Sequence, residues 1–265
     1  MPNIVVNGLR TYYERGGLGE PLVLLHGILH DSRGWSSQLE ALSNDFDVIV
    51  PDLPGCGQSD DPPESHRTPD YGRWLTAFVE ALATGPAHVC GLSWGGMLAI
   101  ELYRQRPDMV ASLILADTYA GWKGSLPPAT VSQRLQQCLA ESEMAAADFI
   151  PGWMPGLLTD AASTSMRAEV ATIMSDFHPA GYRTMARCVA ESDLTSVLPM
   201  INVPTLLIWG AEDRRSPASI ANAFHATIPH STLALIPDSG HLSNIETTDA
   251  FNQAIRDFVA AQKSS

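Results

Sequence analysis

Short, continuously apolar runs alternate with helix-like segments over most of this chain, and this alternation constrains the fold more than any other feature. Runs such as PLVLLHG (21–27), DVIVPDL (47–53) and AHVCGL (87–92) are separated by segments such as WSSQLEALSN, whose apolar residues recur at helical spacing. A strand that is apolar throughout is typical of a parallel sheet covered on both faces. The sequence therefore predicts an α/β fold, with helices on both faces of a mostly parallel sheet.

The alternation stops at about residue 119 and resumes after about residue 198. In between, stretches such as VSQRLQQCLAESEMAAADFI and SMRAEVATIMSDF favour helices, and no convincing strand is found. Strand-like runs return with VPTLLIWG (203–210) and STLALIP (231–237). An interruption of this length is too long for a plain loop in a compact domain. We predict a core domain formed by residues 1–118 and 199–265, with a helical cap inserted at 119–198.

Composition narrows the classes of function. The 265 residues are 45% hydrophobic and 17% charged, as in a globular protein, and the net charge is −13. No Lys/Arg-rich block is present, which argues against a nucleic-acid or membrane partner. A signal peptide and an apolar run of membrane-spanning length are not found, and the four cysteines lack metal-ligand spacing. We expect a cytoplasmic protein without a metal site.

A single serine lies between glycines where a predicted strand meets a predicted helix. Residues 91–95 read GLSWG, which matches the G-x-S-x-G pattern of a nucleophile elbow. Such a turn brings backbone segments close together, so a Cβ at the flanking positions would clash, and free N–H groups at the helix start favour negative charge. A turn serine without chemistry also fits the motif alone. The strand–turn–helix setting favours Ser93 as a nucleophile.

A serine hydroxyl barely ionises at neutral pH, so a nucleophilic serine needs a general base and a group that orients this base. Among the eight histidines, His241 directly follows the last predicted strand, on a loop that can reach the carboxyl ends of the strands. His26 also lies at a strand end, but its place in LLHGI suits a loop-fixing role. We therefore expect His241 to be the base for Ser93.

The orienting acid is expected at another strand end. Asp213 follows the penultimate predicted strand, and a carboxylate there would hold the imidazole in one tautomer. Asp117, which ends the run VASLILAD, could supplement or replace it, and Glu212 is a further alternative. For the oxyanion, the pattern predicts one backbone N–H donor on Trp94 and another on Ile28, in the loop HGILHD.

Five motifs resemble those of the α/β-hydrolase superfamily and span nearly the whole chain: LLHG (24–27), DLPGCGQSD (52–60), GLSWGG (91–96), GAED (210–213) and GHLSNIE (240–246). The resemblance implies an eight-stranded sheet, an inserted cap and the Ser…Asp…His chain order. Within the superfamily, GLSWGGM, HPAGYRTMARCVAESDL and HLSNIE are similar to the 3-oxoadipate enol-lactonase type, which cleaves a small enol-lactone. Trp94 stands where that group commonly has Met.

The resemblance implies a serine hydrolase that needs no cofactor. We expect it to cleave a carboxylic ester or lactone of a small, moderately apolar molecule through an acyl-enzyme, with water as the second reactant. The alternatives are a cofactor-free perhydrolase or acyl transferase, a C–C bond hydrolase, and a ligand-binding receptor of the same fold. The chain is expected to be a monomer or a homodimer.

Two sets of residues are candidates for binding the substrate. The first set offers apolar and hydrogen-bonding contacts: His30, Trp122, Trp153, Tyr182 and Leu242. A lactone of the enol-lactonase pathway carries a free carboxylate and would need a cation in the pocket. The cations considered for this role are Arg33, Lys123, Arg183 and Arg187.

Overall fold

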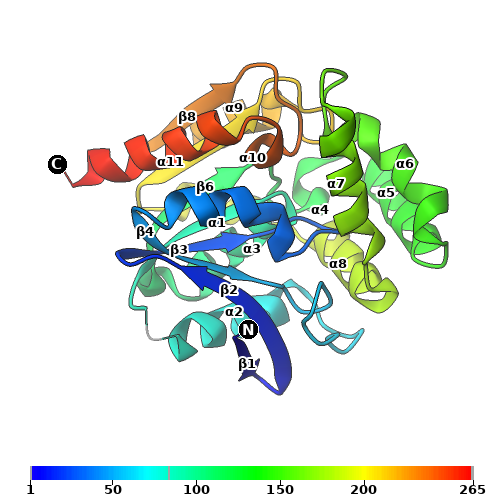
Figure 1. Cartoon of the computed structure of the whole chain (residues 1–265), viewed down its shortest axis with the longest axis horizontal. Coiled ribbons are helices and arrows are strands. Elements are labelled where there is room, and N and C mark those ends of the chain that lie inside the picture. Colours follow the sequence, from blue (N-terminus) through cyan, green and yellow to red (C-terminus); the bar gives the residue numbers. More distant parts are fainter. Residues whose placement is uncertain (1, 83, 264–265) are drawn as a thin grey trace.

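The computed structural model describes residues 2–82 and 84–263, and its centre is one eight-stranded sheet (Figure 1). Across the sheet the strand order is β1-β2-β4-β3-β5-β6-β7-β8. Strands β1 and β2 pair antiparallel, as do β2 and β4, and all other pairs are parallel. The predicted mostly parallel α/β sheet is thereby confirmed. The strands are β1 Asn3–Val6, β2 Leu9–Gly16, β3 Glu20–Leu25, β4 Phe46–Pro51, β5 Ala87–Leu92, β6 Val110–Ala116, β7 Thr205–Gly210 and β8 Ser231–Ile236.

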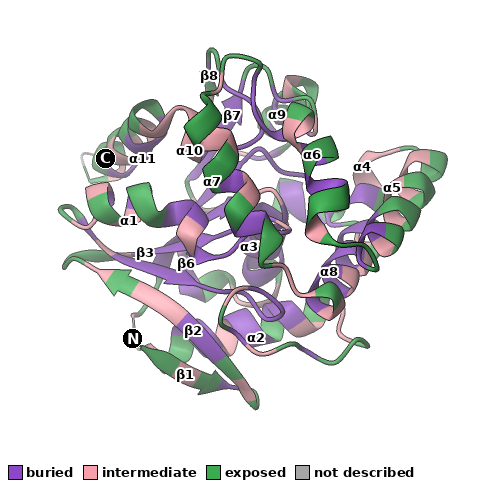
Figure 2. Cartoon of the chain, turned by 45° about the vertical axis from the view of Figure 1, so that its right-hand side comes forward, coloured by how far each residue is buried: buried purple, intermediate pink, exposed green. Residues whose placement is uncertain are grey.

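The central strands are buried because helices cover both faces of the sheet. Every residue of β5 and β7 is buried. Figure 2 shows buried residues concentrated at the centre of the molecule, for example at β7. Apolar residues stand side by side in the parallel register, as Leu24, Cys90 and Ile114 do. Continuous apolar strands are what two covered faces require.

On each face of the sheet, neighbouring helices pack against each other as well as against the sheet. Helices α1 (Ser36–Leu42) and α11 (Thr248–Gln262) pack together on one face, and α2 (Thr68–Ala81) and α3 (Trp94–Gln105) pack together on the other (Figure 1). Helix α9 (Ala218–Thr227) packs against β7 and β8. The shorter segments are η1 Ser32–Trp35, η2 Pro107–Met109 and α10 Ser243–Glu246. Within the described ranges, no helix is long and apolar enough to cross a membrane.

Between β6 and β7 the fully described stretch 117–204 forms helices and no strand. Its elements are α4 Trp122–Ser125, α5 Pro128–Glu141, α6 Ala146–Leu157, α7 Thr164–Ser175, α8 Pro179–Glu191 and η3 Thr195–Met200. Helices α4 to α8 lie together at one side of the molecule, on the right of Figure 1. We call residues 119–198 the helical insertion. Aromatic contacts of Phe149 with Phe177 and Tyr182 hold α6 against α8.

Candidate active site

Ser93 lies at a sharp turn between β5 and α3. Its φ of 54° and ψ of −116° fall in a region that side-chain-bearing residues seldom adopt. A Cβ on Gly91 would lie 2.2 Å from the carbonyl oxygen of Gly95, and a Cβ on Gly95 would lie 2.1 Å from that of Leu25. Both positions therefore accept only glycine, and the strained turn at Ser93 depends on them.

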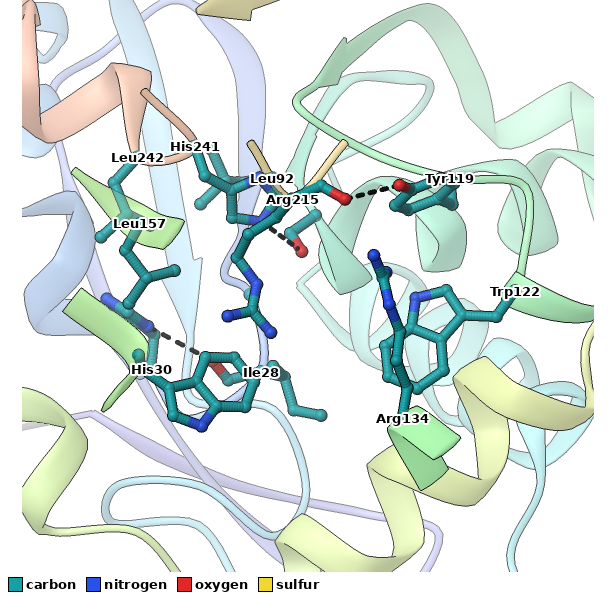
Figure 3. A pocket seen from close by; sticks show the side chains of 13 residues that line it. Ile28, His30, Leu92, Tyr119, Trp122, Arg134, Leu157, Arg215, His241 and Leu242 are labelled. Carbon is teal, nitrogen blue, oxygen red and sulfur yellow. Dashed lines mark hydrogen bonds between the residues drawn. The ribbon is translucent and has the colours of Figure 1, made fainter. Parts of the chain in front are cut away.

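Two hydrogen-bond contacts link Ser93, His241 and Asp213. Ser93 Oγ lies 3.0 Å from His241 Nε2, and His241 Nδ1 lies 2.8 Å from Asp213 Oδ2. Figure 3 shows the first contact as a dashed line from His241. The three residues meet because each follows the carboxyl end of a parallel strand: Ser93 after β5, Asp213 after β7 and His241 after β8. Such an arrangement can move a proton from a hydroxyl to an imidazole.

Asp213 is held as an ionised carboxylate. Its Oδ1 accepts the backbone N–H groups of Arg215 and Ser216 at 2.7 and 3.0 Å, and its Oδ2 accepts the Ser216 hydroxyl at 2.5 Å. Burial alone would raise the pKa of Asp213. The charge of His241 and the hydrogen bonds from His241 and Ser216 outweigh burial, so the pKa of Asp213 is below its ordinary value.

The two alternative acids do not contact His241. Asp117 is fully buried and accepts the backbone N–H of Gly210 at 2.8 Å and the hydroxyl of Ser243. Burial, and then the charge of Asp213, raise the pKa of Asp117 well above its ordinary value. Glu212 is exposed. The structure therefore brings Asp213 to the imidazole, whereas Asp117 bonds to β7 and to the start of α10.

The two expected oxyanion donors belong to residues close to Ser93: Trp94 follows it in the chain, and Ile28 lines the same cavity as Ser93. Trp94 is the first residue of α3, so its backbone N–H has no acceptor inside the helix. Ile28 lies on the loop after β3, where a Cβ on Gly27 would lie 3.4 Å from the Cβ of Ser93. His26 fixes this loop: its Nε2 accepts the backbone N–H of Leu53 at 3.0 Å, and its Nδ1 lies 2.8 Å from the Gly27 carbonyl oxygen.

A narrow cavity of about 40 Å³ opens beside Ser93 (Figure 3). By the same measure a water molecule needs roughly 10–15 Å³, so the cavity has space for a few waters. Four of the five residues expected to bind substrate line it, namely His30, Trp122, Trp153 and Leu242. The complete lining is Gly27, Ile28, His30, Leu92, Ser93, Tyr119, Trp122, Arg134, Trp153, Leu157, Arg215, His241 and Leu242.

Tyr182 is placed elsewhere than the sequence suggested. It is fully buried inside the helical insertion, where its hydroxyl donates to Glu141 Oε2 at 2.7 Å. Trp153 Nε1 donates to the same oxygen at 3.0 Å. Tyr182 therefore packs α8 against α5 and α6, and it does not line the cavity.

His30 offers a hydrogen-bonding group at the cavity. Its Nδ1 lies 3.3 Å from the Ile28 carbonyl oxygen, and its Nε2 is buried with no hydrogen-bond partner among the described residues. Burial lowers the pKa of His30 to about 4, so the ring is neutral at physiological pH. A neutral imidazole there can give or accept one hydrogen bond from a bound molecule.

None of the cations considered from the sequence lines the cavity. Lys123 is exposed, and the three arginines pair with acids outside the cavity: Arg33 with the buried Asp31 and with Asp176, Arg183 with Glu64 and Glu143, and Arg187 with Glu64.

Two other arginines, Arg134 of α5 and Arg215 of the loop after β7, line the cavity instead. Arg215 follows Asp213 by two residues on a strand-end loop, a position that could have located it. Arg134 carries no comparable signal, because it lies in a helix with many polar residues.

The chain matches the model of the Alpha/beta hydrolase family over residues 22–254 and belongs to this family. Among its relatives, the (E)-2-((N-methylformamido)methylene)succinate hydrolase of Acinetobacter baylyi is 26% identical over 253 residues, covering 94% of each chain. The 3-oxoadipate enol-lactonase 2 of the same organism is 27% identical over 224 residues, which cover 83% of this chain and 81% of the enol-lactonase. The structure of a thermophilic esterase from Thermogutta terrifontis, with malate bound, matches with a TM-score of 0.91, 29% identity and 98% coverage of each chain. The resemblance seen in the sequence motifs is thereby confirmed.

Proposed function

We propose that the protein is a serine hydrolase that cleaves a carboxylic ester or lactone of a small molecule. The observation that carries this proposal is the pair of contacts from Ser93 Oγ to His241 Nε2, 3.0 Å, and from His241 Nδ1 to Asp213 Oδ2, 2.8 Å. The strained backbone at Ser93 adds support, because strain of this kind persists where the surrounding structure fixes a functional group. Esterase and enol-lactonase relatives support the same reaction class.

In the first half-reaction, Ser93 Oγ attacks the substrate carbonyl carbon while His241 Nε2 takes the hydroxyl proton. The Asp213 carboxylate accepts a hydrogen bond from the Nδ1–H of His241 and stabilises the imidazolium without taking its proton. The backbone N–H groups of Ile28 and Trp94 stabilise the oxyanion. The carbon–oxygen bond to the alcohol then breaks, and His241 returns the proton to the leaving oxygen. An acyl-Ser93 ester remains.

In the second half-reaction, water attacks the acyl-enzyme. His241 takes a proton from the water as its oxygen bonds to the acyl carbon, and the second tetrahedral intermediate forms at the same two N–H groups. The bond to Ser93 Oγ breaks, His241 protonates that oxygen, and a carboxylic acid is released. For a lactone, the alcohol stays on the same molecule as the new acid. Both half-reactions use the same side chains and backbone N–H groups, and water enters in the second.

We also propose that the helical insertion acts as a cap over a core of residues 1–118 and 199–265. Trp122, Arg134, Trp153 and Leu157 belong to the insertion and line the cavity together with Ser93 of the core. A cavity of about 40 Å³ is far smaller than ordinary ligand sites of roughly 300–1,000 Å³. A substrate therefore requires the insertion to open, and closure over a small acyl group would exclude water from the reacting atoms.

The test is hydrolysis of p-nitrophenyl acetate and of a panel of lactones and short esters. Ser93→Ala is expected to lower kcat/KM by at least about 10³-fold, because the remaining hydrogen-bond donors cannot form an acyl-enzyme. Ser37→Ala, at an exposed serine outside the cavity, is the matched control. Ser93→Ala activity within tenfold of the parent protein refutes the proposal.

A fluorophosphonate probe identifies the nucleophile directly. We expect it to label Ser93, as located by mass spectrometry, and to label Ser93→Ala at background. A protein that neither reacts with the probe nor turns over any substrate would be a binding protein of this fold. Product analysis with added alcohol or peroxide distinguishes hydrolysis from acyl transfer and perhydrolysis.

A further inference from the structure

Arg134 and Arg215 differ from most arginines of this acidic chain in lacking a carboxylate partner. Arginines such as Arg15, Arg104 and Arg256 form ion pairs with side-chain carboxylates at 2.6–2.7 Å. Within residues 2–82 and 84–263, neither Arg134 nor Arg215 forms an ion pair, and both line the cavity beside Ser93. With a net charge of −13, the chain has abundant acids to pair with any surface arginine. These two cations therefore lack a carboxylate partner at the cavity that contains Ser93.

Arg215 is held in place by its neighbours. Its guanidinium carbon lies 3.6 Å from the ring centroid of Trp153, a stacked cation–π contact. Its backbone is fixed at both ends, because its N–H donates to Asp213 Oδ1 at 2.7 Å and its carbonyl accepts the Tyr119 hydroxyl at 2.5 Å. A side chain held this way is preorganised, so little conformational entropy is lost when it binds a ligand.

Arg134 approaches the same space from the helical insertion. Its guanidinium carbon lies 5.4 Å from the ring centroid of Trp122 and 5.9 Å from that of Tyr119. Figure 3 shows its guanidinium and that of Arg215 among the side chains around the cavity. Arg134 also hydrogen-bonds to the Tyr119 side chain. Each guanidinium has five N–H donors, so stacking on aromatic rings leaves donors for a bound molecule.

The two cations repel each other, and the charge of Asp213 offsets this repulsion only in part. Burial and then the charge of Arg134 lower the pKa of Arg215. The nearby carboxylates serve other groups: Asp213 pairs with His241, and Glu141 accepts from Trp153 and Tyr182. A desolvated like-charge pair is costly, and an anion between the two groups would relieve it.

We propose that Arg134 and Arg215 form a carboxylate-binding subsite, so that the preferred substrates are short esters or lactones carrying a second, ionised carboxylate. This inference rests on the proposed hydrolase function of Ser93. A guanidinium binds a carboxylate through two parallel N–H···O bonds, which fixes orientation as well as charge. Because both arginines line the same cavity as Ser93, the bound carboxylate would hold the scissile carbonyl close to the serine. The narrow cavity limits the link between carboxylate and carbonyl to a few atoms.

The experiment compares two esters of equal acyl length, monoethyl succinate and ethyl butyrate, followed by titration of the released acid. We expect the parent protein to favour monoethyl succinate in kcat/KM. Arg134→Gln and Arg215→Gln are each expected to lower the succinate/butyrate ratio of kcat/KM about tenfold or more, as loss of a charged hydrogen bond does. Arg134→Lys is expected to retain part of the preference. Lysine keeps the positive charge but cannot form the two parallel N–H···O bonds of a guanidinium.

Arg214→Gln is the matched control, since Arg214 is adjacent in sequence, pairs with Asp160 at 3.5 Å and does not line the cavity. Its ratio is expected to equal that of the parent. Circular-dichroism melting establishes that each variant is folded. If Arg215→Gln does not fold, Arg134→Gln and Arg134→Lys carry the test. An unchanged succinate/butyrate ratio in both Gln variants overturns the subsite.

Succinate binding gives a readout that does not depend on catalysis. We expect succinate to raise the Tm of the parent protein and of Ser93→Ala alike, and to raise that of Arg134→Gln and Arg215→Gln much less. If Ser93→Ala remains active while succinate stabilisation depends on the two arginines, the hydrolase proposal fails and the subsite stands. If Ser93→Ala is inactive and the arginine variants retain both the preference and the Tm shift, the subsite fails and the hydrolase proposal stands.

Discussion

At the residue scale, the candidate site consists of side chains whose positions are fixed by groups immediately around them. Ser93 is fixed by a strained turn whose flanking glycines cannot be replaced without a backbone clash. Asp213 is fixed by two backbone N–H groups and the hydroxyl of Ser216, and it in turn fixes the ring of His241. Preorganisation of this kind lowers the reorganisation that the reaction requires.

The two buried aspartates at this edge of the sheet predict a contrast in activity. Asp213→Asn presents an amide N–H₂ to His241 Nδ1 or loses that contact, so the ring no longer keeps its Nε2 free to accept the Ser93 proton. We expect kcat for ethyl butyrate to fall about 10⁴-fold. Asp117→Asn is expected to change kcat less than tenfold, because Asp117 bonds to Gly210 and Ser243. A larger loss in Asp117→Asn than in Asp213→Asn would reverse the assignment of the orienting acid.

Asp117 also predicts a pH dependence of stability. Burial and the charge of Asp213 raise its pKa in the folded protein. Between the unfolded pKa, about 4, and the raised folded pKa, the folded state binds more protons than the unfolded state, so stability falls as the pH rises. Asp117→Asn removes this loss. The Tm of Asp117→Asn minus that of the parent is therefore expected to increase from pH 4 to pH 9. A difference that stays constant or decreases contradicts the raised pKa.

At the element scale, helix α6 combines a functional position with a weak backbone. Trp153 and Leu157 of α6 line the cavity, and the helix contains Pro151 and Pro155 in its interior. Each proline lacks the N–H that would bond to the carbonyl four residues earlier. Fewer helical hydrogen bonds therefore stabilise α6, which is consistent with the proposed opening of the insertion.

This weak backbone predicts fast amide exchange in α6. Backbone amides of Ala146–Leu157 are expected to exchange with deuterium faster than those of α3. Gly152→Ala is expected to slow that exchange and to stabilise the helix by about 0.5–1 kcal/mol, since a Cβ there meets nothing within 4 Å. If opening of α6 admits the substrate, the same variant lowers kcat/KM for the longer esters of the panel. Equal exchange rates in α3 and α6 would contradict the prediction that the backbone of α6 opens more readily.

The strands and helices were predictable from the sequence where burial produces a regular pattern of apolar residues along the chain. Strands covered on both faces show unbroken apolar runs, and the glycines around Ser93 report a crowded turn. The sequence does not show which face of a helix in the insertion turns toward the cavity. Arg134 lies on α5 among glutamines on several sides, so its direction toward the cavity depends on packing against α8. Tyr182 was expected at the cavity for its residue type, yet its hydroxyl is buried against Glu141.

At the scale of the whole molecule, the helical insertion and the sheet are joined close to His241. Glu246, the last residue of α10, accepts the backbone N–H of Thr159 at 2.9 Å and that of Gly240 at 2.7 Å. The Thr159 hydroxyl also donates to it. In addition, the Leu242 N–H donates to the Leu157 carbonyl oxygen at 3.1 Å. One carboxylate therefore links the end of α6 to the loop that carries His241.

The carboxylate of Glu246 is expected to stabilise both the fold and the site. Glu246→Gln keeps the size of the side chain, but one of the two backbone N–H groups then faces an amide N–H₂ and loses its acceptor. An unpaired buried donor costs about 1–3 kcal/mol, so the free energy of unfolding in urea is expected to fall by that amount. Because Gly240 precedes His241 and Thr159 follows α6, deuterium exchange is expected to rise in both segments and kcat to decrease.

Glu212→Gln, at an exposed glutamate near the same edge, is the control and is expected to match the parent. Equal unfolding free energies for the two variants would mean that the insertion is held to the sheet by apolar packing alone.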